Sequence, residues 1–159
     1  MEAFLDIETT GLFPNQDNIT VIGIFLTNGS HNRFVQLVGD RITPQNLLEP
    51  LQGTTMLYTY NGSRFDIPFI RRRLGVDLSV MYDHCDLMFE CWHNDLRGGL
   101  KSVERQLNIP RKLKEVDGVE AIRLWWRYIN SYDEKALNLL LEYNKEDVVN
   151  LKTLRDRLF

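Results

Sequence analysis

Two acidic side chains lie in an otherwise apolar segment near the start of the chain, Phe4-Leu5-Asp6-Ile7-Glu8. In a strand, alternate residues point to opposite faces, so Asp6 and Glu8 share one face with Phe4. Neighbouring carboxylates on a strand face repel each other, and strands are depleted in Asp. The pair therefore indicates either a solvated strand face or a site where hard oxygen ligands gather around Mg²⁺ or Mn²⁺.

Two further carboxylates occur where they could join such a site. Asp66 follows the turn-forming residues 61–65 (NGSRF), near an expected helix start, where a helix cap is its ordinary role. Asp147 follows Tyr143 by four residues, which places both on one helix face, with an amphipathic boundary pair as the alternative. Residues 9–11 (TTG), directly after the acidic strand, form a sharp turn whose amides and hydroxyls suit a phosphate or sugar.

Together these segments resemble the three exonuclease motifs of the DnaQ-like DEDD superfamily, which has a ribonuclease H-like fold and removes nucleotides from 3′ ends. The matching segments are DIETTG at residues 6–11, NGSRFD at 61–66 and YNKED at 143–147. The last is similar to the Tyr-x-x-x-Asp motif of the tyrosine subtype, because Glu142 stands where the histidine subtype has His. Residues 86–88, 100–102 and 143–144 also resemble the compact predicted exonucleases of the YprB type.

The resemblance implies a role for each residue of these motifs. Asp6 would bridge two divalent cations, Mg²⁺ or Mn²⁺, with Glu8 and Asp147 on the first ion and Asp66 on the second, partly through water. Tyr143 would hydrogen-bond the attacking water or the scissile phosphate, since a free phenol, with a pKa of about 10, is a poor base. The residues expected around the terminal nucleotide are the Thr10 backbone, Leu12, Asn61 and Phe65.

Three functions are compatible with these features. The first is a metal-dependent 3′–5′ exonuclease that hydrolyses single-stranded DNA or RNA by a two-metal-ion mechanism. The second is a non-catalytic or partner-dependent nucleic-acid-binding domain that keeps the metal site. The third is a ribonuclease H-type endonuclease, which the Tyr-x-x-x-Asp motif disfavours. No residue decides between DNA and RNA, and the sequence identifies no protein partner.

The pattern of apolar residues predicts an α/β fold with a mixed five-stranded sheet flanked by helices, in one domain over residues 1–159. The resemblance implies that this fold is of the ribonuclease H-like type. An Asn28-Gly29 turn predicts a hairpin between the second and third strands. Ser131 and Glu134 are spaced as a capping box for a long final helix. The expected strands are 3–8, 19–27, 33–38, 55–60 and 81–85. The expected helices are 44–51, 65–74, 87–92, 100–107, 119–129 and a final helix that starts directly after Ser131 and reaches 158.

Composition agrees with a globular protein and limits the class of partner. The 159 residues are 43% hydrophobic and carry a net charge of −3, which does not favour bulk capture of nucleic acid. No segment reads as a membrane span or a secretion signal, so we expect a cytoplasmic protein with reduced cysteines. Residues 97–114 contain six cations and one acid, Glu104, and could follow a nucleic-acid backbone or simply form a solvated helix face.

Overall fold

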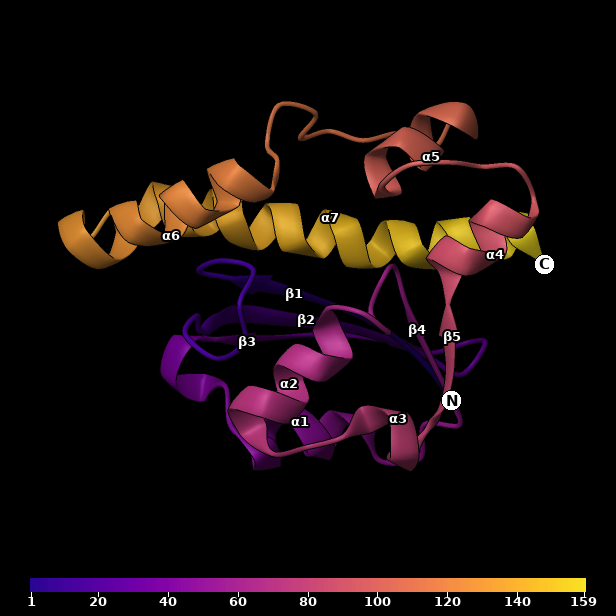
Figure 1. Ribbon diagram of the computed structural model, residues 1–159, viewed down its shortest axis with the longest axis horizontal. Coiled ribbons are helices and arrows are strands. Elements are labelled where there is room, and N and C mark those ends of the chain that lie inside the picture. The colour runs from indigo at the N-terminus through magenta and orange to yellow at the C-terminus, as the bar shows by residue number, and fades with distance from the viewer.

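The computed structural model describes residues 1–159, which form a five-stranded mixed sheet between two layers of helices (Figure 1). The sheet order is β3-β2-β1-β4-β5, with antiparallel pairing among the first three strands and parallel pairing of β1 with β4 and of β4 with β5. The strands are β1 (Glu2–Thr9), β2 (Ile19–Thr27), β3 (Asn32–Val38), β4 (Met56–Thr59) and β5 (Asp83–Asp86). The predicted fold class is therefore confirmed.

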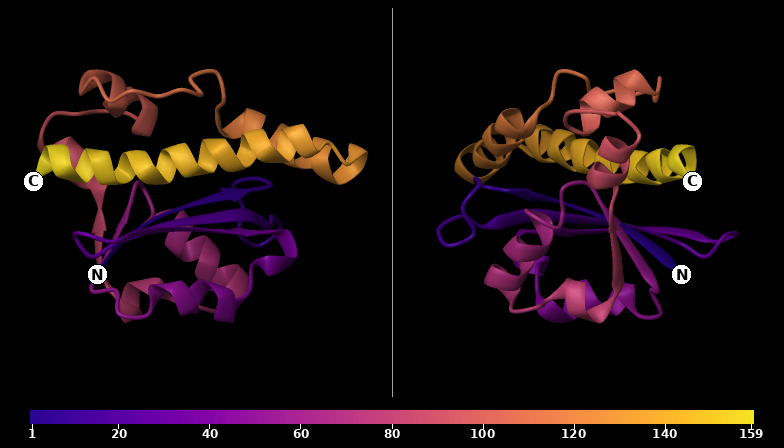
Figure 2. Two further views of the ribbon diagram at one scale, coloured as in Figure 1. Left: turned by 180° about the vertical axis from the view of Figure 1, so that it is seen from behind. Right: turned by 45° about the vertical axis from the view of Figure 1, so that its right-hand side comes forward.

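One helical layer lies on each face of the sheet, as the two views in Figure 2 show. The helices α1 (Pro44–Leu51), α2 (Asp66–Leu74) and α3 (Leu78–Met81) cover one face, with a 3₁₀ turn at Gly39–Arg41 before α1. The helix α7 (Glu134–Leu158) runs along the other face. The remaining helices lie on the side of α7: α4 (Leu87–His93), α5 (Leu100–Gln106) and α6 (Gly118–Ser131). No helix is both long and apolar enough to cross a membrane.

The alternation predicted for β1 sets which residues meet which helical layer. Leu5 and Ile7 are buried in the apolar cluster formed with α1, α2 and α3. Phe4 is buried in the cluster that contains Val148 and Leu151 of α7. Because Asp6 shares the face of Phe4, the acidic residues of β1 point toward α7, and the buried sheet positions those carboxylates.

Two local predictions were wrong, and one of the two alternatives for residues 97–114 is excluded. The fifth strand is Asp83–Asp86 rather than 81–85, because α3, which was not predicted, already occupies residues up to Met81. The long final helix is not capped by Ser131, which still belongs to α6. A left-handed Tyr132 reverses the chain, and the Asp133 side chain caps α7 by accepting a hydrogen bond from the Ala136 amide. The basic residues 97–114 do not form one solvated face, because Glu104 and Arg111 are buried.

Candidate metal and active site

Three predicted ligands converge although they come from opposite ends of the chain. Asp6 and Glu8 project from β1, and Asp147 projects from the middle of α7, which lies across that strand (Figure 1). Each of the three offers one carboxylate oxygen, and these oxygens all lie within 4.8 Å of one another. The sheet and α7 thus create a cluster of hard oxygen donors of the kind that divalent cations prefer.

Asp66 is tied to the same strand but lies outside that group of three. It is the first residue of α2 and only 3% exposed. Its Oδ2 accepts a hydrogen bond from the Ile7 amide at 3.0 Å, so it meets β1 between Asp6 and Glu8. An ordinary helix cap was the alternative role for this side chain, but its Oδ2 is bound across elements to β1.

The electrostatics of the cluster favour a bound cation. Burial, with further contributions from neighbouring carboxylates, raises the pKa of Asp6 and of Glu8 well above their ordinary values. Burial also raises the pKa of Asp66 to about 7 and that of Asp147 to about 6. One oxygen of Glu8 is buried without any hydrogen-bond partner. An oxygen-only donor set with an unpaired buried oxygen fits a divalent cation, which would replace the protons that these groups otherwise take up.

A buried amide on α7, to which the sequence analysis gave no role in the site, holds Asp6 in place. Asn144 donates from Nδ2 to the Asp6 backbone oxygen at 3.2 Å and to Asp6 Oδ2 at 3.3 Å. Its own oxygen accepts from Gln36 Nε2 at 3.0 Å, and the same nitrogen bonds the Leu141 carbonyl at 2.8 Å. Gly23 pairs with Asp6 across the sheet and leaves the space that Asn144 fills. A polar residue directly after Tyr143, among the apolar residues of α7, was the available signal.

The loop of residues 61–65 is held by hydrogen bonds to Asp86, another residue that the sequence analysis did not assign to the site. Asp86 accepts from the Asn61 amide at 2.7 Å, the Ser63 amide at 3.1 Å and the Ser63 hydroxyl at 2.6 Å. It also caps α4 by accepting from the Met88 amide. These bonds stabilise Asn61 in a left-handed conformation, φ 60°, with its side-chain oxygen buried and unpaired. The loop delivers Asp66 to the site at its end.

The other residues expected around a nucleotide lie in different environments. Leu12 is 72% exposed at the loop after β1, so most of its side chain is open to a ligand. Phe65 is half-buried and packs edge-on against Phe69, with ring centroids 5.4 Å apart, so it serves the core as well. Thr10 is engaged within its own loop, because its amide bonds the Asn18 carbonyl at 2.9 Å and its hydroxyl accepts from the Asn18 amide at 3.0 Å.

Tyr143 borders the cluster from the α7 side and is 7% exposed. Burial and then the nearby Asp147 raise the pKa of the phenol above its ordinary value, so it stays protonated at neutral pH. The Lys101 ammonium lies over its ring, 5.1 Å from the centroid. A protonated phenol in this place can donate a hydrogen bond, as predicted, and cannot accept a proton as a base.

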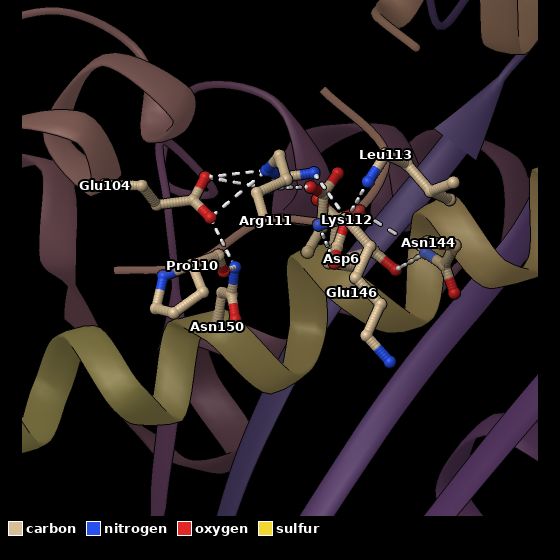
Figure 3. A network of polar contacts seen from close by, with 10 residues as sticks. Asp6, Glu104, Pro110, Arg111, Lys112, Leu113, Asn144, Glu146 and Asn150 are labelled. Atoms are coloured by element: carbon tan, nitrogen blue, oxygen red, sulfur yellow. Dashed lines mark hydrogen bonds and ion pairs between the residues drawn. The ribbon is translucent and has the colours of Figure 1, made fainter. Parts of the chain in front are cut away.

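Arg111 contacts a carboxylate of the cluster directly, which the sequence analysis did not anticipate. Its Nη2 donates to Asp147 Oδ1 at 2.5 Å. The same nitrogen donates to Glu104 Oε1 at 2.8 Å (Figure 3). The guanidinium is buried, so this residue cannot be one of the solvated cations expected in residues 97–114. Beside it, Lys101, Arg105 and Lys114 line a cavity of about 450 Å³.

Comparison with known proteins agrees with this geometry. Residues 3–159 match the family model of the RNase H superfamily. The chain belongs to that superfamily. Its fold and its acidic cluster are those expected of an RNase H-like nuclease, as the motifs predicted.

Individual relatives and structures extend the comparison. Bacillus subtilis YprB is 29% identical over 174 residues, which cover 95% of this chain and 40% of YprB, so the chain spans less than half of that relative. Brucella melitensis NrnC bound to pGG has a similar structure, with a TM-score of 0.69, 21% identity, and coverage of 99% of this chain and 71% of NrnC. A family B DNA polymerase from Pyrobaculum calidifontis has a TM-score of 0.74 and 16% identity, with coverage of 99% and 24%.

Proposed function

We propose that this domain, residues 1–159, is a 3′–5′ exonuclease of the tyrosine subtype. It hydrolyses phosphodiester bonds at the 3′ end of single-stranded DNA or RNA and uses two divalent cations, Mg²⁺ or Mn²⁺. The observation that carries the proposal is the convergence of Asp6, Glu8 and Asp147 within 4.8 Å on a fold of the RNase H superfamily. NrnC, which shares the fold, has been described with Mg²⁺ and with pGG, which supports this class of cofactor and ligand.

Each carboxylate has a definite task in this proposal. Asp6, at the centre, would be shared by both cations, with Glu8 and Asp147 on one side and Asp66 on the other. When bound, the cations lower the pKa of the attacking water and stabilise the leaving oxygen. The buried β1 strand and α7 hold the donors in place, so the ligands need no large rearrangement to bind a cation.

Tyr143 and the exposed loop residues would position the substrate. The phenol donates a hydrogen bond to the attacking water or to an oxygen of the scissile phosphate, because its raised pKa keeps the proton in place. Leu12, exposed on the loop after β1, would pack against the terminal base together with Phe65. Asn61 and the Thr10 turn would contact the sugar and phosphate of the same nucleotide.

The cavity beside α5 would bind the part of the nucleic-acid substrate that extends away from the site. Lys101, Arg105 and Lys114 line it, and none of them forms an ion pair within the chain. Unpaired cations beside an acidic site suit phosphates of the substrate strand, although the chain as a whole has a net charge of −3.

The test is digestion of 5′-labelled single-stranded DNA and RNA with Mn²⁺, with Mg²⁺ or with EDTA, by wild type and by Asp6→Asn. We expect wild type to shorten the strands from the 3′ end in a metal-dependent ladder of products. The rate of nucleotide release should fall by at least about 10³-fold in the variant, because the bridging ligand is lost. A ladder of equal rate from Asp6→Asn contradicts the assignment. Metal-dependent binding of a 3′ end without cleavage favours the accessory-domain alternative, and cuts in a circular substrate favour an endonuclease.

A further inference from the structure

Arg111 belongs to a buried polar network that ends on a proposed metal ligand. Besides its bond to Asp147, the guanidinium makes three contacts with Glu104, at 3.0 and 3.1 Å from Nε and at 2.8 Å from Nη2. Arg111 is 8% exposed and Glu104 is 1% exposed. Glu104 also accepts a short hydrogen bond from Asn150, which follows Asp147 by three residues and so lies on the same face of α7 (Figure 3).

The backbone on both sides of Arg111 is also fixed to α7. Asn150 Nδ2 donates to the Pro110 carbonyl at 3.3 Å on one side. On the other side, the Lys112 and Leu113 amides donate to the two oxygens of Glu146, at 2.7 and 2.9 Å. Hydrogen bonds therefore hold both the backbone and the guanidinium of Arg111, and they keep the guanidinium in contact with Asp147.

We propose that Arg111 is a positioning residue for metal binding: held by Glu104 and Asn150, it occupies one oxygen of Asp147 and so fixes that carboxylate to face Asp6 and Glu8. The inference rests on the proposed function only for the identity of Asp147 as a metal ligand. Oδ2 of Asp147 accepts no hydrogen bond from the chain and is the oxygen left for a cation. Partners that orient a metal ligand in this way are worth about 10- to 100-fold in metal affinity or activity.

The charge on Arg111 acts in the opposite direction from its orienting effect, because a positive charge repels a cation. Glu104 contacts the guanidinium three times, whereas Asp147 contacts it once. The Arg111–Glu104 pair is close to neutral, so it adds little repulsion toward a cation several ångströms away. In Arg111→Gln the Glu104 carboxylate keeps its charge, which favours a cation, so a loss of Mn²⁺ affinity in this variant would show that the orientation of Asp147 is the larger effect.

The test measures Mn²⁺ affinity by isothermal titration calorimetry without nucleic acid, together with thermal unfolding in EDTA. We expect Arg111→Gln to weaken Mn²⁺ binding by about 10- to 100-fold, and Arg111→Lys to be intermediate because it restores the charge but not the fork of donors. Arg123→Gln removes the same charge from an exposed site on α6 and leaves the affinity unchanged. Unchanged or tighter Mn²⁺ binding by Arg111→Gln overturns the proposal, as does a loss of thermal stability alone.

A second variant covers the case in which Arg111→Gln does not fold. Asn150→Ala removes the support of Glu104 and of Pro110 without a change of charge. If orientation matters, this variant weakens Mn²⁺ binding severalfold; an affinity equal to that of wild type overturns the proposal. Failure of the proposed function looks different, because wild type itself would then bind no Mn²⁺ or would not shorten 3′ ends.

Discussion

The close approach of α7 to the sheet at Gly23 provides a stringent prediction. A methyl group built at this glycine lies 2.2 Å from the Asn144 Oδ1 and 2.9 Å from the Val148 Cγ2. Gly23→Ala therefore forces Asn144 out of the position in which it bonds Asp6 and Gln36. The expected result is a less stable protein with a poorly held Asp6, because one added carbon displaces the amide that supports it.

The magnitude follows from three terms. Overpacking of a filled core costs about 1–3 kcal/mol. The hydrogen bonds of Asn144 to Gln36 and to Asp6 contribute about 0.5–1.5 kcal/mol each, and both are lost. The greater backbone freedom of glycine in the unfolded chain returns about 0.5–1 kcal/mol on substitution. The net loss is about 1–5 kcal/mol, which lowers the thermal midpoint by about 3–15 °C at roughly 3 °C per kcal/mol.

A double-mutant cycle separates this mechanism from general damage to β2. Urea unfolding in EDTA would be measured for wild type, Gly23→Ala, Asn144→Ala and the double variant. Because the clash is with the Asn144 side chain, Gly23→Ala should cost at least about 1 kcal/mol less when that side chain is already absent. Additive losses would refute the reasoning, since they would show that the two sites do not compete for the same space.

Two further predictions concern pH and substrate binding. In the folded protein the pKa of Asp66 is about 7 and that of Asp147 is about 6, against 3.8 for an ordinary Asp. Between about pH 4 and pH 7 the folded chain therefore binds more protons than the unfolded chain. The metal-free protein should lose stability as the pH rises through this interval. Thermal melts in EDTA check this, and a midpoint that rises over the interval contradicts it, while saturating Mn²⁺ should abolish the loss. Leu12→Ala should raise KM for single-stranded substrates about 10-fold. Because the side chain is exposed, the free energy of unfolding should stay within about 0.5 kcal/mol of wild type. Val80→Ala, at another exposed position, is the matched control, and an equal KM for the two variants would exclude Leu12 from the substrate site.

The β1 strand shows how much of this site is present in the sequence. Period-two alternation places Asp6 and Glu8 opposite Leu5 and Ile7, and the structure buries the apolar pair against α1, α2 and α3 as that pattern requires. The four-residue spacing of Tyr143 and Asp147 likewise fixes their common face on α7. Such relations depend on backbone geometry between near neighbours, so they can be predicted without knowledge of the rest of the fold.

The partners of these residues were decided only by tertiary structure. Asp66 bonds the Ile7 amide instead of capping its own helix, and Arg111 is buried against Asp147 instead of lining a solvated basic face. Asn144 matters because Gly23 of a different element leaves room for it. In each case the deciding contact joins residues far apart in the chain, and its energy depends on burial, which a local pattern does not specify. The sequence by itself determined which groups could do chemistry and on which face of their own element they lie, and the packing of α7 on the sheet determined what each of them touches.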